Sequence, residues 1–121
     1  MNMTKLGEME QRFADLIWEH APVESGTLVR LCADAFDWKK STTYTMLRRL
    51  CERGLFKNEG GCVEVVFTKE AFLAAQTKDF VRETFGGSLP KFLAAFSGGD
   101  ALSEEEVAAI EDMIVNYRKG K

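Results

Sequence analysis

The chain contains few of the residues that build metal sites and covalent frameworks. Its 121 residues include three cysteines, one histidine and two prolines. The cysteines are odd in number, far apart and without a CxxC pair, which argues against a disulfide framework. A lone His20 beside scattered cysteines also gives no metal-ligand set. We therefore expect no metal and no cofactor, while the role of Cys62, which follows a Gly-Gly pair, stays open.

Membrane and enzyme signatures are also missing. No apolar run approaches the roughly 18 residues that a bilayer span requires. The N-terminus lacks the basic-then-apolar pattern of a secretory signal. No GxGxxG, phosphate-loop, GxSxG or HExxH sequence occurs, and the acids of 104–106 suit a solvated helix start better than a catalytic pair. We expect a cytoplasmic protein that is not an enzyme.

Positive charge is concentrated in one stretch of the chain. Residues 38–57 hold six Lys or Arg and one acid, a net charge of +5, whereas the whole chain carries −3. Phosphate binding requires such a local concentration of cations, whatever the overall charge. The hydrophobic fraction of 45% is that of a globular protein, so we expect this stretch to belong to a folded domain.

Apolar spacing predicts three helices and a hairpin in the first half of the chain. The helices are expected over 6–19, 25–35 and 41–53, with Ser25 and then Ser41 or Thr42 as N-caps. Two β-prone runs then flank the turn at 59–61, a hairpin signal. This order is the winged helix-turn-helix plan, in which the third helix is the recognition helix and the hairpin is the wing.

The second half of the chain predicts three more helices. Helical patterns over 70–85 and 89–96 precede a last helix that opens with a capping box, Ser103 and Glu106. Apolar residues then recur at steps of 3, 4 and 3, in coiled-coil fashion, at Val107, Ile110, Ile114 and Tyr117. Such a stripe is buried in the chain's own core or against a second subunit. We favour the second subunit, because these helices follow a domain that is already complete.

The fold expected is therefore mainly α with a small β-hairpin. A winged helix-turn-helix DNA-binding domain over 1–69 is followed by C-terminal dimerisation helices over 70–121. The residues expected to hold two copies together are Phe85, Phe92, Phe96, Val107, Ile110, Ile114 and Tyr117.

The first turns of the expected recognition helix carry hydroxyls and a guanidinium. In helix-turn-helix proteins these turns contact base edges, which hydroxyl and Arg side chains can read. Capping by the hydroxyls, packing of the tyrosine against the wing and a solvated Arg are the competing interpretations. The candidates for base contact are Ser41, Thr42, Tyr44, Thr45 and Arg48.

Cations around that helix are candidates for phosphate contact, which fixes register and carries no sequence information. Any one of them can equally be a solvated charge. We expect the ring of Trp38 to pack against the first helix rather than to contact DNA. The phosphate candidates are Lys39, Lys40, Arg49, Lys57 and Asn58.

The order of these segments resembles the penicillinase and methicillin-resistance repressor family, whose copper-responsive relatives share the fold. The stretch from Trp38 to Leu50, followed by Gly54 and Leu55, is similar to the family's recognition helix and is the most specific segment. The chain has no cysteine after Cys62, so it lacks the C-terminal cysteine cluster of the copper branch. The other matching segments are 6–10 with 16–18, 65–67, and 85–89 with 92–96 and the acid-capped last helix.

The resemblance implies a homodimeric transcriptional repressor. Each subunit would place its winged helix on one half of a palindromic operator in double-stranded DNA. In the antibiotic-responsive branch a membrane sensor protease triggers cleavage near the junction of the last two helices. The matching bond here is Ala95–Phe96, and this chain has Ala95 where family members carry Asn.

Two other functions are consistent with the residues. One is a winged-helix adaptor that binds proteins and not DNA, and salt-dependent retention on DNA would distinguish it. The other is a DNA-binding regulator that senses a small molecule and is not induced by cleavage. Five aromatic residues suggest it: Phe72, Phe80, Phe85, Phe92 and Phe96.

Overall fold

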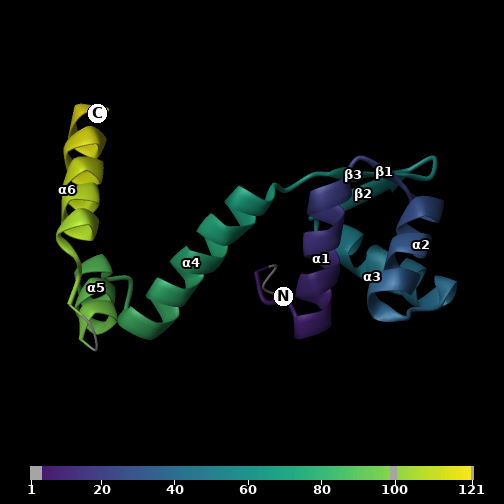
Figure 1. Ribbon diagram of the computed structural model, residues 1–121, viewed down its shortest axis with the longest axis horizontal. Helices are drawn as coiled ribbons and strands as arrows, with labels where there is room; N and C mark the ends of the chain where they lie inside the picture. The colour runs from purple at the N-terminus through teal and green to yellow at the C-terminus, as the bar shows by residue number, and fades with distance from the viewer. Residues whose placement is uncertain (1–3, 99–100, 121) are drawn as a thin grey trace. The chain divides into compact units, whose positions relative to one another are not determined.

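The computed structural model describes residues 4–98 and 101–120 and confirms a winged helix-turn-helix fold followed by C-terminal helices (Figure 1). It divides into two compact units, one ending at Asp79 and one beginning at Phe80. Among the described residues, no helix is both long and apolar enough to cross a membrane. The elements in chain order are α1 (Glu8–His20), β1 (Val23–Glu24), α2 (Ser25–Phe36), α3 (Lys40–Glu52), β2 (Phe56–Glu59), β3 (Cys62–Val65), α4 (Lys69–Phe85), α5 (Leu89–Ser97) and α6 (Glu104–Lys119).

The wing is part of a three-stranded antiparallel sheet with strand order β1-β3-β2. The predicted hairpin is confirmed, and its turn places Gly60 and Gly61 at φ of 60° and 84°. Those positive φ angles are the ones that a two-residue hairpin turn requires. The prediction missed β1, in which Val23 pairs with Val63, because two residues are too few to show an alternating pattern.

A closed hydrophobic core holds the first unit together. Each helix contributes the residues of its apolar stripe, and β2 and β3 contribute one residue each. A core of this kind stabilises the unit through the removal of apolar area from water. The core residues are Phe13, Ala14, Ile17, Val23, Leu28, Cys32, Leu47, Leu50, Leu55, Phe56, Val63 and Phe72.

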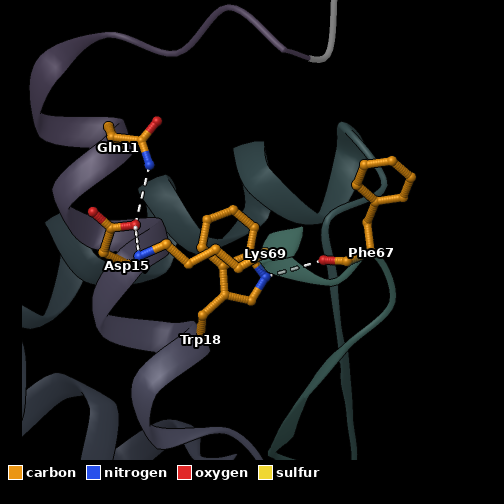
Figure 2. A network of polar contacts seen from close by, with 5 residues as sticks. All are labelled: Gln11, Asp15, Trp18, Phe67 and Lys69. Atoms are coloured by element: carbon orange, nitrogen blue, oxygen red, sulfur yellow. Dashed lines mark hydrogen bonds and ion pairs between the residues drawn. The ribbon is translucent and has the colours of Figure 1, made fainter. Parts of the chain in front are cut away.

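Polar contacts fix the connection between the wing and α4 onto α1 (Figure 2). The Trp18 indole N–H donates to the carbonyl oxygen of Phe67 at 3.0 Å. One carboxylate oxygen of Asp15 lies 3.3 Å from Lys69 Nζ and accepts from Gln11 Nε2 at 3.1 Å. The start of α4 is therefore packed as part of the first unit.

This arrangement corrects the expected place of Phe72. Phe72 was expected among the aromatic residues of the C-terminal helices, but it is fully buried in the first unit, 5.4 Å from the Trp18 ring. Farther along the helix, Gln76 Nε2 donates to the Thr4 carbonyl at 3.1 Å, and the Thr4 hydroxyl donates to Asp79 at 2.8 Å. A helix that looked C-terminal in sequence thus completes the N-terminal core.

The expected N-caps of α2 and α3 are wrong by one position and by two or three positions, respectively. Helix α3 begins at Lys40 with Lys39 as its N-cap, so Ser41 lies inside the first turn. Helix α2 begins at Ser25, with Glu24 as its N-cap. Neither N-cap makes a side-chain capping bond. The expected N-caps were chosen because Ser and Thr are preferred at that position. The residue at which each helix begins depends instead on how the folded chain packs.

The second unit contains the aromatic residues of the C-terminal helices. The predicted capping box of α6 is confirmed, with the Glu106 amide donating to Ser103 Oγ and the Ser103 amide donating to Glu106 Oε1, both at 3.0 Å. Ring centroids of Phe85 and Phe92 are 5.8 Å apart, and those of Phe92 and Phe96 are 6.2 Å apart. None of its described residues is buried.

Candidate nucleic-acid interface

Helix α3 has one face in the core and one in solvent. Thr43, Leu47 and Leu50 are buried, spaced by four and three residues as one side of a helix requires. The exposed positions carry hydroxyls or cations and almost no apolar surface. These exposed residues are Lys40, Ser41, Thr42, Thr45, Arg48, Arg49 and Glu52.

One group of candidates clusters on the first half of that exposed face. Ser41, Thr42, Thr45 and Arg49 line a shallow hollow of about 250 Å³ together with Met46. Three hydroxyls beside a guanidinium offer both donors and acceptors to a base edge, and a cation to the adjoining phosphate. The structure brings these predicted base and phosphate candidates together.

A second group faces the wing. Arg48 and Tyr44 line a hollow of about 230 Å³ with Leu47, Cys51 and Asn58. Asn58 lies on β2, so this hollow joins the recognition helix to the wing. The helix and the hairpin thereby present polar groups to one continuous surface.

Tyr44 is held from behind by α2. Its hydroxyl donates to Ser25 Oγ at 3.0 Å, and the half-buried ring packs against the core. The competing interpretation was packing against the wing, whereas the hydrogen bond of Tyr44 is made to α2. The phenolic oxygen keeps acceptor capacity, which a base or a sugar hydroxyl can use.

Lys39 and Lys40 lie at the N-terminus of α3. Both are exposed, and within the described part of the chain neither forms an ion pair. The free amides of a helix's first turn and its dipole favour an anion at the same place. The charges of the two lysines and the helix dipole would therefore both attract a phosphate.

Trp38 fixes the position of these lysines. Its ring lies 5.2 Å from Phe13 on α1 and 4.9 Å from Phe36 on α2, measured between centroids. The prediction that it packs against the first helix is confirmed. This aromatic contact holds the backbone from which Lys39 and Lys40 extend.

The charge of Lys57 is offset inside the wing. Lys57 Nζ lies 3.2 Å from a carboxylate oxygen of Glu59 and 3.7 Å from one of Glu64. The hydrogen bond and charge of Glu59, followed by Glu64, raise the pKa of this exposed lysine. The net charge of +5 was taken over residues 38–57, so it did not include Glu59 or Glu64. The register of the hairpin, which pairs Lys57 with Glu64, is what indicates this ion pair.

The predicted dimerisation residues lie on α4, α5 and α6, and much of their apolar surface is exposed. Phe96 is 61% exposed and Ile114 51%. Exposed apolar surface of this extent is typical of interaction sites. Between α5 and α6, a groove of about 310 Å³ is lined by Phe92, Leu93, Phe96, Leu102, Glu106, Ala109 and Ile110.

The candidate cleavage bond, Ala95–Phe96, lies inside helix α5. Both residues are exposed. A protease that binds its substrate as an extended strand would have to unwind this helix, which ends at Ser97. The two residues are therefore exposed to solvent, but the helical conformation protects the bond between them from such a protease.

The three cysteine thiols are free. Burial raises the pKa of Cys32 to about 11, against a smaller opposing effect of a hydrogen bond with Thr43. Burial, aided by the charge of Glu52, also raises the pKa of Cys51. Both thiols are thus poor nucleophiles, as expected for small apolar residues of a core.

Comparison with known proteins agrees with this architecture. The sequence model of the penicillinase repressor family matches residues 6–116. The chain is also similar to the penicillinase repressor of Bacillus licheniformis, with 20% identity in an alignment 121 positions long that covers 97% of this chain and 94% of that protein. The family match spans the winged helix-turn-helix, α4, α5 and most of α6. The chain belongs to the penicillinase repressor family of transcriptional repressors.

Proposed function

We propose that the chain represses transcription as a homodimer that binds a specific double-stranded operator, with α3 in the major groove. The observation that carries this proposal is the division of α3 into a buried apolar face and an exposed face of hydroxyls and cations. A helix held rigidly on one side by a core, with polar groups on the other, is what base reading requires.

The candidate residues take two roles in this proposal. Phosphate contacts by Lys39, Lys40, Arg49, Lys57 and Asn58 position the helix, and their ionic part weakens as salt rises. Lys57 must exchange Glu59 and Glu64 for phosphate, so we expect it to contribute less than the lysines of α3. The side chains that read bases are Ser41, Thr42, Tyr44, Thr45 and Arg48.

Two copies of the chain would match the two halves of a palindromic operator. In this division of labour the first unit, which ends at Asp79, binds DNA, and the second unit, which begins at Phe80, holds the dimer. The exposed apolar residues of α5 and α6 support it, because a second copy would remove them from water. The protein would act in the cytoplasm, where its operator lies.

Release from DNA has two candidate routes. A membrane sensor protease would trigger cleavage at Ala95–Phe96, which would separate α6 from the rest of the chain. Alternatively, an apolar ligand would bind the groove between α5 and α6 and alter the dimer, and the apolar lining of that groove supports this route. Release of intact chain from DNA by a ligand would distinguish the second route from the first.

The test is a titration against DNA from upstream of the protein's own gene, beside random DNA of equal length, at two salt concentrations. We expect two chains per site, preference for the upstream DNA, and weaker binding at higher salt. Lys40→Ala should weaken binding to both DNAs, whereas Lys91→Ala, an exposed cation of α5, serves as the charge-matched control and should not. A stable dimer that does not distinguish the DNAs and shows no salt dependence would instead favour the protein adaptor.

A further inference from the structure

Helix α6 carries an apolar stripe that the second unit leaves largely exposed. Val107 is 42% exposed, Ile114 51% and Tyr117 67%, while Ile110 is half-buried beside α5. The four residues lie within one side of the helix, because their steps of 3, 4 and 3 stay close to its period of 3.6 residues. The stripe is about 15 Å long at 1.5 Å per residue.

The spacing of this stripe reads the same in both directions. Steps of 3, 4 and 3 are symmetric about a point level with Asp112, which lies on the opposite side of α6 by helical periodicity. If two α6 helices pack antiparallel about a twofold axis at that level, Val107 comes level with Tyr117 of the second copy. Ile110 likewise comes level with Ile114, so the smallest side chain of the stripe lies beside the largest.

The charges of α6 favour the same orientation. Its first turn contains three acids and its last turn contains Arg118 and Lys119. In an antiparallel pair each acidic turn lies beside a basic turn, and the helix dipoles also oppose each other favourably. In a parallel pair, acids would lie beside acids at one end and cations beside cations at the other.

One acid and one cation are placed to interact across such a pair. Glu104 and Arg118 are 14 residues apart, close to four helical turns, so both lie along the same flank of the stripe. Antiparallel pairing brings like flanks together. With the axis level with Asp112, Arg118 comes within two residues along the helix of Glu104 of the second copy. Glu105 and Lys119 point away from the stripe by the same periodicity and would not meet.

From the palindromic stripe and these charges, we propose that α6 pairs antiparallel with α6 of a second copy about a twofold axis level with Asp112. The proposal rests on the homodimer proposed above and specifies its geometry. The apolar stripe supplies the affinity, because exposed ion pairs contribute little, and the charges select the orientation. A contact of this symmetry uses the same surface on both copies, so it closes at two chains and does not form filaments.

Cysteine cross-linking distinguishes the orientations in the full chain. Chains with Val107→Cys and Tyr117→Cys are prepared separately, mixed, and treated with a short thiol cross-linker, and the linked peptides are identified by mass spectrometry. We expect peptide 107 linked to peptide 117 in the mixture, and little linkage in either chain alone. Linkage of 107 to 107 and of 117 to 117 in the separate chains would overturn the proposal.

Charge reversal supplies a second test. Glu104→Lys should raise the dissociation constant of the dimer by about five- to tenfold, since it places two cations side by side at both ends. Adding Arg118→Glu should restore it to within about twofold. The matched controls, Glu105→Lys alone and with Lys119→Glu, make the same changes on the side that points away and should have less than a twofold effect.

The outcomes separate this geometry from the dimer itself. A wild-type chain that sediments as a monomer would overturn the proposed dimer and the antiparallel pairing together. A stable dimer whose affinity rises with Glu104→Lys would overturn only the antiparallel pairing, because a parallel pair gains when acids no longer face acids.

Discussion

The two units of this chain bury their apolar residues very differently. The first unit places twelve apolar residues in a closed core, ten of them Val, Leu, Ile or Phe. The second unit has none of its described residues buried, and Phe96, Met113 and Tyr117 are among its most exposed side chains. Both halves show amphipathic helices in sequence, so periodicity identifies the faces that will be covered but not the molecule that covers them.

This difference indicates two kinds of domain. Burial of a large apolar side chain contributes about 1.5–3 kcal/mol, which the first unit gains within one chain. The second unit leaves that free energy available for association. The first unit is therefore a complete fold that positions α3, and the second is, in the proposed dimer, one half of a shared core.

Removal of a core side chain should unfold the first unit. Phe13→Ala deletes a ring that is fully buried and packs on Trp38, so we expect a loss of about 3–5 kcal/mol of unfolding free energy, independent of protein concentration. Urea denaturation followed by Trp fluorescence measures it. Phe96→Ala is the matched control, and a comparable loss of stability in the first unit from that variant would contradict the division into units.

A charge in the α6 stripe should act on association instead. Ile114→Glu would place a carboxylate against the apolar surface of a second copy, so we expect the dimer dissociation constant to rise at least about a hundredfold, by the cost of burying an unpaired charge. Sedimentation equilibrium measures the change. Asn116→Glu adds the same charge on the other side of α6 and should leave the mass unchanged, and equal dissociation by both variants would argue against the stripe.

Arg48 tests base reading by the first unit. Arg48→Ala should cost about 1–3 kcal/mol of operator binding and relax the preference at one base pair. Competition binding with operator variants measures both effects, beside Lys40→Ala, which should weaken binding uniformly across sequences. An equal loss for Arg48→Ala on specific and random DNA would show that Arg48 contacts phosphate only.

Removal of two acids from the wing should strengthen the binding of DNA. Glu59→Gln with Glu64→Gln removes the two carboxylates beside Lys57, so we expect a roughly two- to fivefold increase in affinity for random DNA at low salt. Fluorescence anisotropy measures it. Adding Lys57→Ala should cancel most of the gain, and an unchanged gain would mean that removal of negative charge alone explains the effect.

Cysteine reactivity tests the burial of the first unit in the unmutated chain. With a pKa of about 11, roughly one Cys32 in a thousand is a thiolate at pH 8, so it should alkylate far more slowly than half-exposed Cys62. The raised pKa also means that the unfolded chain loses this proton first, so stability should fall as pH rises from about 9 to 11. Mass spectrometry after iodoacetamide treatment measures the rates, and rapid labelling of native Cys32 would contradict its burial.

The sequence predicted the features that depend on local pattern. All six helices, the hairpin and the Ser103–Glu106 capping box are confirmed, because periodicity and caps are properties of neighbouring residues. The placement of Phe72 and the strand β1 depended on contacts distant in sequence. The pairing of Lys57 with Glu64 required the strand register, which a charge count along the chain ignores.

Amide hydrogen exchange across a dilution series tests the central comparison most directly. The account predicts that protection of α1 and α3 is independent of protein concentration, whereas protection of α5 and α6 falls as the chain is diluted through the dimer dissociation constant. Strong protection of α5 and α6 in the fully dissociated chain would contradict it, because the second unit would then be a complete core on its own.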